Sequence, residues 1–378
     1  MKLPIYLDYM ATTPVDPRVA ARMVDCLTNT EQFGNAASAH VYGKQAAALI
    51  ERSRALIADL IHAAPAEIIW TSGATEANNI AIRGAALARK EKGRHIITSQ
   101  LEHKAVLDVC RALEEEGFRV TYLPADQSGV VQPEQIAVAI QPDTILVSIM
   151  HVNNEIGVIN NIEQIGRLTR ERGIWLHVDA AQSIGKVAID LTQMPVDLMS
   201  FSAHKVYGPK GVGALFIRLR PRARIVPTLF GGGQERGLRP GTLPTHQIVG
   251  MAEAFTLGIS EMAEHNQRIA ELTTLLWDGI KSLPGIGLNG DTRCRVAGNL
   301  NICFNGLSKT IIDSSLQDIA ISAGSACNAF ATDRSHVLRA LGLSNQQIEA
   351  SRRFSLGRFS TEQEIKYAIT YIREMYER

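Results

Sequence analysis

Residues 201–211 read FSAHKVYGPKG and carry the strongest structural signal in the chain. They follow the apolar run VDLMS at residues 196–200, so Lys205 stands where a strand-like segment enters a glycine-rich turn. A second such run, WLHVDAAQS at residues 175–183, places Asp179 at the end of another buried strand. Open α/β sheets bind ligands at the carboxyl ends of their strands. The two segments therefore predict an α/β sheet with a functional site at that edge.

The pair Lys205 and Asp179 also indicates a particular chemistry. Each residue alone has an ordinary explanation, a surface lysine and an aspartate that caps a helix. Together they suit a lysine that holds pyridoxal phosphate as a Schiff base and a carboxylate that pairs with the protonated pyridine nitrogen. We therefore expect this cofactor at the strand ends.

The size and composition favour an ordinary globular enzyme. A chain of 378 residues favours one large domain with a smaller one. Its 46% hydrophobic and 20% charged residues are typical of soluble proteins. The formal net charge of +1 gives no reason to expect nucleic acid or a membrane surface as a partner. No apolar run approaches the roughly 20 residues that span a bilayer, and residues 1–14 lack a signal-peptide pattern.

The cysteines are few and scattered. They are Cys26, Cys110, Cys294, Cys303 and Cys327, without CxxC spacing. This pattern predicts no metal site, and the odd number argues against a disulfide framework. We expect a cytoplasmic protein.

Strand-like and helix-like runs alternate from about residue 65 to 220, which predicts a mainly parallel sheet covered on both faces. Near residue 255 the pattern changes. A long helical run at residues 252–283 ends before Pro284, and shorter strands and helices follow. We expect that helix to connect the large domain to a smaller α/β domain.

A phosphate site is predicted where residues 71–79, TSGATEANN, open a helix after a strand. Gly73 permits close backbone approach, and the N–H groups of Ala74 and Thr75 lie at the helix N-terminus, which favours a dianion. Ser202 and His204 would add donors. Ordinary capping by Ser72 or Thr75 is the competing explanation.

Other polar residues follow neighbouring strands. His103 is a candidate to stack on the cofactor ring and move protons. Asn154 and Gln182 are placed to bind the phenolic oxygen of the cofactor or a substrate carboxylate. A solvated histidine and two structural amides are the alternatives.

The segment around Cys327, residues 322–342, is rich in small and polar residues, which suggests an exposed loop and a thiol able to act as a nucleophile. Arg353 is a candidate clamp for a substrate carboxylate, with Arg352 and Arg358 as alternatives. Thr242, after a glycine-rich loop, could reach a phosphate across a subunit boundary.

These motifs together resemble those of one enzyme family. YLDYMATTPVDPRV, FGNAASAH, TSGATEANN, EHKAV, HVNNEIG, HVDAAQSIGK, FSAHKVYGPKG, GGGQERGLRPGTLP, GSAC and RFSLGRF occur in the order typical of cysteine desulfurases of the IscS/NifS-like group. These are class-V, fold-type I pyridoxal-phosphate enzymes. The resemblance implies a large domain with a mainly parallel seven-stranded sheet at residues 16–255. It implies a smaller α/β domain from residues 1–15 and 256–378, with the cysteine loop at about 322–336.

The resemblance also implies site roles. Catalytic roles fall to Lys205, Cys327 and His103. Cofactor binding falls to Ala74, Thr75, His103, Asn154, Asp179, Gln182, Ser202, His204, Lys205 and the partner subunit's Thr242 in a homodimer. Asn35, Asn154 and Arg353 would bind the carboxylate of L-cysteine. Cys327 would take the sulfur as a persulfide and pass it to an acceptor protein, leaving L-alanine.

Some positions depart from the family pattern. Met10, Ala36, Ala203 and Pro240 replace residues that are usual there. Residues 328–336, NAFATDRSH, also differ, and the sequence ends at Arg378, short of a C-terminal tail that docks the scaffold protein in housekeeping members. We expect these differences to affect the choice of sulfur acceptor: cluster assembly, tRNA thiolation or DNA phosphorothioation.

Two other functions remain open from the sequence. A selenocysteine lyase or class-V aminotransferase would use the same scaffold, and transamination would need no cysteine. A non-catalytic scaffold for sulfur transfer is the third hypothesis, and the intact set of Lys205, Asp179, His103 and Cys327 argues against it.

Overall fold

The computed structural model describes residues 4–323 and 334–377 and contains an α/β sheet that matches the predicted fold class. Within these residues the large sheet has seven strands in the order β2-β8-β7-β6-β5-β3-β4. The strands are β2 (Ile68–Thr71), β3 (His95–Ser99), β4 (Arg119–Leu123), β5 (Thr144–Ser148), β6 (Trp175–Asp179), β7 (Leu198–Ser202) and β8 (Gly213–Ile217). Only β8 runs antiparallel to its neighbours, so the carboxyl ends of the other strands of this sheet meet at one edge.

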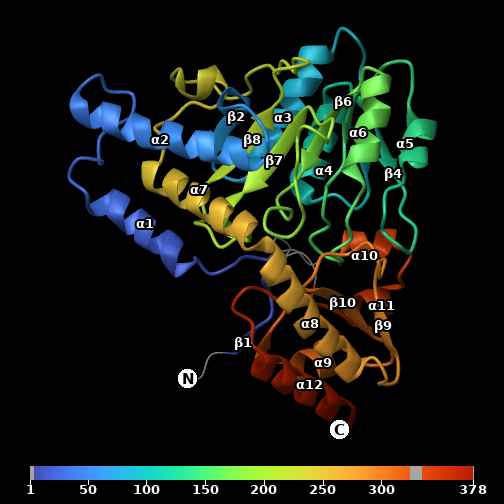
Figure 1. Ribbon diagram of the computed structural model, residues 1–378. Helices are drawn as coiled ribbons and strands as arrows, with labels where there is room; N and C mark the ends of the chain where they lie inside the picture. Colours follow the sequence, from blue (N-terminus) through green and yellow to red (C-terminus); the bar gives the residue numbers. More distant parts are fainter. Residues whose placement is uncertain (1–3, 324–333, 378) are drawn as a thin grey trace.

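Helices cover both faces of this sheet (Figure 1). They are α1 (Pro17–Thr28), α2 (Val41–Leu60), α3 (Ala74–Arg89), α4 (Lys104–Glu115), α5 (Pro133–Ala139), α6 (Ile162–Glu171) and α7 (Thr245–Ser260). Helices α3 and α4 pack on one face, and α2, α5, α6 and α7 pack on the other. Burial on both faces explains why β5 and β7 are apolar over most of their length.

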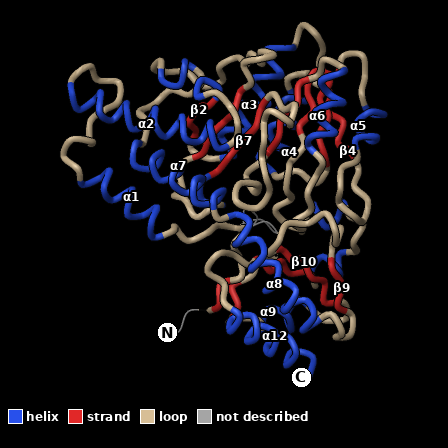
Figure 2. The backbone as a smooth tube through the Cα atoms, viewed as in Figure 1, coloured by secondary structure: helices blue, strands red, loops and turns tan. Residues whose placement is uncertain are grey.

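A second group of elements follows α7, and Figure 2 shows its strands well separated from those of the large sheet. It contains α8 (Met262–Ile280), β9 (Ile286–Leu288), β10 (Asn299–Phe304), α9 (Lys309–Ser315), β11 (Ile319–Ala320), α10 (His336–Ala340), α11 (Asn345–Glu349), β12 (Ser351–Ser355) and α12 (Glu362–Glu377). Strands β12, β10 and β9 form an antiparallel sheet, while β1 (Ile5–Tyr6) pairs with β11. Helices α8 and α12 share an apolar cluster with β10 and β12. The N-terminal strand β1 is therefore part of this second group of elements.

The prediction of one long helix at residues 252–283 is wrong in one respect. The helix is broken at Glu261. Helix α7 ends at Ser260 and α8 begins at Met262, and the Glu261 backbone at φ −100° and ψ 5° is not helical. Its N–H bonds to Leu257 O at 3.1 Å, which closes the last turn of α7. The chain therefore changes direction where it passes from the large sheet to the second group.

Candidate active site

A cavity of about 380 Å³ lies at the carboxyl edge of the large sheet. It is walled by the β2–α3 turn, the ends of β6 and β7, residues 10–12 and strand β12. Ten of the predicted site residues line it: Ala74, Thr75, His103, Asn154, Asp179, Gln182, Ser202, His204, Lys205 and Arg353. The fold thus brings together most of the predicted site, whose individual roles stay predictions.

Asp179 ends β6 and is almost fully buried. Its Oδ2 accepts a hydrogen bond from Asn78 Nδ2 at 2.8 Å, and its Oδ1 accepts one from Ala181 N at 2.9 Å. These two donors fix the plane of the carboxylate in the cavity wall. A carboxylate held in this way can accept the N–H of a protonated heterocycle.

Lys205 lies in a single 3₁₀ turn, Ala203–Lys205, directly after β7. Its Nζ donates to Met10 O at 2.8 Å and to Ala11 O at 2.6 Å. Lys186 lies close by, because its Nζ donates to Gln182 Oε1 and to Lys205 O, both at 3.3 Å. Burial, aided by the charge of Lys205, lowers the pKa of Lys186 to about 7.

The start of α3 provides an uncapped helix N-terminus. Gly73 is the N-cap residue, and no side chain makes a capping hydrogen bond there. The predicted alternative, a cap by Ser72 or Thr75, is therefore not what the structure shows. Glu76 in the first turn also lines the cavity, and its carboxylate is neutralised by Arg239 at 2.7 Å and accepts from Ser72 N at 3.0 Å. Backbone N–H groups without partners in their own helix suit an anion.

His204 lies beside this helix end. Its Nδ1 is 3.0 Å from Thr12 Oγ1. Burial, reinforced by three neighbouring lysines, lowers the pKa of His204 to about 4, so the ring is neutral at pH 7. A neutral ring can still donate one N–H to an anion.

His103 is the N-cap residue of α4, and its Nδ1 accepts from Ala105 N at 3.1 Å. It also lines the cavity, where the sequence placed it, and its role as a helix cap was not predicted. The bond to Ala105 fixes Nδ1 as an acceptor. The proton of a neutral ring is then on Nε2.

Arg353 enters the cavity from β12 with a side chain that is 1% exposed. Its Nη2 pairs with Asp8 at 2.6 Å, and its Nη1 donates to Asn154 O at 2.6 Å. Burial raises the pKa of Asp8, and the Arg353 charge opposes that shift. The guanidinium is thus held in place by two bonds, and its Nε makes none within the described residues.

Asn35 and Thr242 do not reach this cavity. They line a separate hollow of about 400 Å³, together with Glu235. Thr242 was predicted to act from a partner subunit, which is compatible with a position outside its own cavity. Asn35 lies between α1 and α2, and a single chain does not bring it to Arg353.

Comparison with known proteins decides the family. Residues 5–368 match the aminotransferase class-V family. A protein named cysteine desulfurase IscS from Azotobacter vinelandii is 56% identical over 369 residues, covering 97% of this chain and 91% of the relative. The protein of the same name from Aeromonas salmonicida is 56% identical over 375 residues, covering 99% and 93%. This chain belongs to the class-V aminotransferases, among the cysteine desulfurases.

Solved structures of similar proteins agree with the desulfurase family. A NifS-like protein has a TM-score of 0.90 at 35% identity, with 99% of each chain covered. SspA in complex with cysteine has a TM-score of 0.83 at 39% identity, covering 94% of this chain and 100% of that one. DndA from Streptomyces lividans has a TM-score of 0.80 at 41% identity, covering 92% and 98%.

The predicted sulfur-accepting residue of this desulfurase, Cys327, lies outside the described residues. The segments on either side of that gap are described. Ser322 exchanges backbone hydrogen bonds with Arg353, at 2.7 and 3.3 Å. On the other side, Ser335 Oγ donates to Glu155 Oε2 at 2.6 Å, and His336 Nε2 is 2.9 Å from Glu102 O. The first flank is therefore bonded to Arg353, which lines the cavity, and the second to Glu155 and Glu102, which are next in sequence to the lining residues Asn154 and His103.

Sequence reasoning missed several residues of this desulfurase site, notably Asp8, Asn78 and Lys186. Asp8 and Asn78 bond directly to predicted site residues, and Lys186 bonds to Gln182. Asn78 lies in TSGATEANN and Lys186 in HVDAAQSIGK, so both were inside quoted motifs. The partner of Asn78, Asp179, lies on another element, and Lys186 bonds both to the nearby Gln182 and to the carbonyl of Lys205 in the turn after β7.

Two features are absent from residues 4–323 and 334–377. No group of three or more His, Cys, Asp or Glu side chains there is arranged to hold a metal ion. No helix in these ranges has both the length and the apolar character needed to cross a membrane.

Proposed function

We propose that this desulfurase uses pyridoxal phosphate to remove the sulfur of L-cysteine, and that Cys327 receives it as a persulfide. The observation that carries the proposal is the placement of Lys205 and Asp179, which line one cavity from the ends of two adjacent strands, β7 and β6. The family implies the cofactor. A related structure, SspA, is described in complex with cysteine.

The residues around the cavity fit the cofactor at both ends. The carboxylate of Asp179 suits the pyridine N–H, while the α3 N-terminus, Ser202 and His204 suit the phosphate. At the phosphate end, the backbone of β8 packs closely against the start of α3. A Cβ added to Gly213 would lie only 2.6 Å from Gly73 Cα. We infer that β8 carries glycine there so that the α3 N-terminus can approach the sheet.

The chemistry then divides among the side chains. When bound, pyridoxal phosphate supplies an electron sink for the carbanion formed at the α-carbon of the amino acid. The Lys205 amine takes and returns the proton at that carbon. Arg353 and Asn154 orient the substrate carboxylate. The Cys327 thiolate forms an S–S bond to the substrate sulfur as the Cβ–S bond breaks, and a proton at Cβ completes L-alanine.

A direct experiment compares the purified protein with Cys327→Ala. The unchanged protein should be yellow and should form L-alanine from L-cysteine, with sulfide released by a reductant. Cys327→Ala should keep the yellow colour and lose that release. Full activity in the variant would refute the role of Cys327. Pyruvate-dependent turnover without sulfur release would favour an aminotransferase, and a preparation that stays colourless with added cofactor would favour a non-catalytic scaffold.

We further propose a homodimer in which Thr242 completes the partner's site. Two largely exposed side chains, Phe33 at 69% and Phe230 at 89%, come two and three residues before Asn35 and Gly233, which line the same hollow as Thr242. Exposed aromatic residues of this size favour a covered interface. The test mixes two inactive variants, Lys205→Ala and Thr242→Arg. A mixed dimer should regain activity because one of its two sites has both natural residues, and failure to regain it would contradict shared sites.

The acceptor is proposed to belong to iron–sulfur cluster assembly. The IscS relatives are 56% identical to this chain, whereas DndA is 41% identical. Transfer of labelled sulfur from the loaded protein to a purified cluster scaffold tests this. Transfer only to a tRNA-thiolation or DNA-phosphorothioation protein would contradict it.

A further inference from the structure

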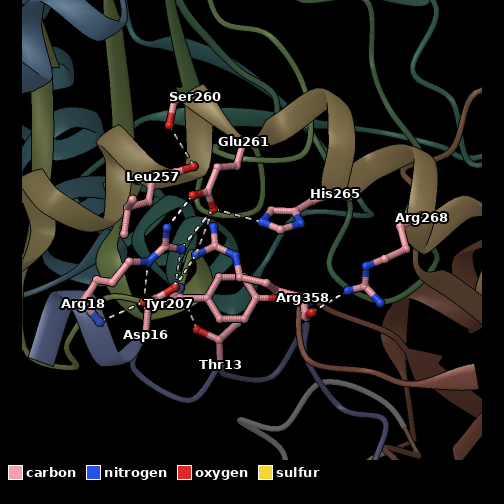
Figure 3. A network of polar contacts seen from close by, with 10 residues as sticks. All are labelled: Thr13, Asp16, Arg18, Tyr207, Leu257, Ser260, Glu261, His265, Arg268 and Arg358. Carbon is pink, nitrogen blue, oxygen red and sulfur yellow. Dashed lines mark hydrogen bonds and ion pairs between the residues drawn. The ribbon is translucent and has the colours of Figure 1, made fainter. Parts of the chain in front are cut away.

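An ionic network in which Arg358 and Asp16 are buried joins the lysine turn to the second group of elements, at the break between α7 and α8 (Figure 3). Its centre is the Arg358 guanidinium, whose side chain is 6% exposed. Arg358 Nη1 lies 2.6 Å from Asp16 Oδ2 and 3.9 Å from Glu261 Oε2. Arg18 also bonds to both carboxylates, at 2.9 Å to Asp16 and 3.0 Å to Glu261.

The charges in this network are balanced and persistent. Hydrogen bonds from Arg18 are the largest cause that lowers the pKa of Glu261 to about 2. The same arginine, together with Arg358, holds the pKa of Asp16 well below its usual range. Both carboxylates therefore remain ionised at physiological pH. A buried, paired and hydrogen-bonded arginine fixes geometry more strictly than an exposed ion pair does.

Arg358 also contacts the turn that carries Lys205. Its Cζ lies 4.4 Å from the centre of the Tyr207 ring, and its backbone N–H donates to the Tyr207 hydroxyl. Tyr207 is two residues after Lys205 and has a left-handed backbone, with φ at 63°. That conformation is held by hydrogen bonds from Tyr207 N to Thr13 Oγ1 at 2.7 Å and from Asp16 N to Tyr207 O at 2.9 Å.

Arg358 itself lies in the loop after β12, the strand that carries Arg353. Arg268 of α8 donates to the carbonyls of Arg358 and Ser360. Gly357 packs so tightly that a Cβ there would lie 2.2 Å from the Tyr9 ring and 2.5 Å from the Tyr207 hydroxyl. The loop therefore has little freedom to shift relative to Tyr207.

We propose that Arg358 is a positioning residue that fixes the substrate clamp Arg353 relative to Lys205. This inference rests on the proposed function, because the proposed function places Arg353 and Lys205 at the two ends of the substrate. Arg358 bridges the loop five residues after Arg353 and the turn two residues after Lys205. Because a misplacement of about 1 Å can reduce catalysis about 100-fold, loss of this bridge weakens substrate binding while the cofactor contacts remain.

The main variant is Arg358→Met, which keeps the length of the side chain and removes its charge. We expect its KM for L-cysteine to rise about tenfold or more, with the absorption spectrum and affinity of the bound cofactor unchanged. The matched control is Arg352→Met. Arg352 is the buried neighbour of Arg353 on the same strand, but it pairs with Asp313 of α9, away from the lysine turn. We expect the control to lose stability and keep its KM within about twofold.

A second experiment, in the Arg353→Ala variant, distinguishes a positioning role of Arg358 from a general contribution to stability. In Arg353→Ala the clamp is gone, so adding Arg358→Met should produce little further loss in kcat/KM. An equal loss in both backgrounds would overturn the inference, as would an unchanged KM in Arg358→Met or an equal KM change in Arg352→Met. Should Arg358→Met fail to fold, Asp16→Asn tests the same bridge from the other side and should raise KM in the same way.

The readout also separates this inference from the proposed function. Binding of the product L-alanine is followed by the absorption of the bound cofactor, so affinity is measured without sulfur transfer. If the unchanged protein binds L-cysteine but forms no L-alanine, the proposed function fails. Weaker binding in Arg358→Met alone would still support the positioning role, and equal binding in both proteins would refute it.

Discussion

At the scale of single residues, Lys205 and Asp179 depend on contacts from elsewhere in the chain. The Lys205 amine is held by the carbonyls of Met10 and Ala11, and the Asp179 carboxylate is held by Asn78 of α3. Asn78 is fully buried, and its Oδ1 has no hydrogen-bond partner within the described residues. An amide buried at that cost indicates that its donor, directed at Asp179, matters to the site.

Replacing Asn78 should therefore weaken cofactor binding. Hydrogen bonds to charged groups contribute about 1.5–3 kcal/mol, so we expect the dissociation constant of pyridoxal phosphate to rise at least about tenfold in Asn78→Ala. Titration of the cofactor-free protein, followed by absorbance, measures it. Asn79→Ala is the control, because that neighbouring amide is exposed and bonds to Thr75 O. Equal affinity in Asn78→Ala and the unchanged protein would contradict the account.

The sequence predicted the residues whose role follows from their place on one strand or turn. Lys205 and Asp179 were recognisable because each stands at the end of an apolar run. Asp8 and Asn78 were not, since Asp8 meets Arg353 across 345 positions and Asn78 meets Asp179 across 101 positions. Only the folded chain brings those pairs together.

At the scale of elements, the start of α3 and the start of β8 are packed against each other. A Cβ on Gly213 would lie 2.5 Å from the carbonyl oxygen of Phe201 and 2.6 Å from Gly73 Cα. Neither backbone atom can move without shifting β7 or the N-terminus of α3. This contact places the candidate phosphate site beside the lysine strand.

Gly213→Ala should accordingly displace the α3 N-terminus. We expect loss of stability of about 1–3 kcal/mol and weaker retention of the cofactor during gel filtration. Gly287→Ala in β9 serves as the control, since the nearest atom to its added Cβ would be Asn305 Nδ2 at 3.8 Å. Normal cofactor retention in Gly213→Ala would show that the close approach has no bearing on the site.

The element predictions failed where tertiary context decides. Strand β4 was not predicted because it is an edge strand, in which Arg119 is exposed and the next three residues are only partly buried. The direction of β8 is set by its pairing with β2 and β7, which periodicity does not encode. At the helix break Glu261 pairs with Arg18 and Arg358, which are distant in the sequence, while the local sequence is typical of a helix.

At the scale of the whole molecule, the mainly parallel seven-stranded sheet is confirmed. The domain limits at residues 15/16 and 255/256 stay a prediction, as does the cytoplasmic location. The alternation of buried runs and amphipathic helices was sufficient for the fold class, because both faces of such a sheet must be covered. The order of its strands required the structure.

Buried histidines should make the molecule sensitive to acid. Burial lowers the pKa of His151 to about 4 and of His177 to about 3, whereas an unfolded histidine has a pKa of about 6.5. Below pH 6.5 the unfolded state binds protons that the folded state does not, so stability present above that pH is lost as the pH falls toward 4 and 3. One pKa unit corresponds to about 1.4 kcal/mol.

His177→Gln tests this dependence. His177 contacts Ser148 and Ser200, and a glutamine can bond to hydroxyls but cannot titrate. The urea midpoint should fall less steeply between pH 7 and pH 5 in the variant than in the unchanged protein. His246→Gln, on a partly exposed residue, provides the comparison. Parallel pH profiles for His177→Gln and the unchanged protein would argue against a buried neutral histidine.

The central claim is that Lys205 is the lysine that binds the cofactor, opposite Asp179. Three lysines lie at or beside the cavity, since Lys205 and Lys210 line it and Lys186 bonds to Lys205 O. Borohydride reduction of the cofactor-loaded protein, followed by peptide mass mapping, identifies the attached residue. The account predicts the cofactor on Lys205 alone, and attachment to Lys186 or Lys210, or to no lysine, would contradict it.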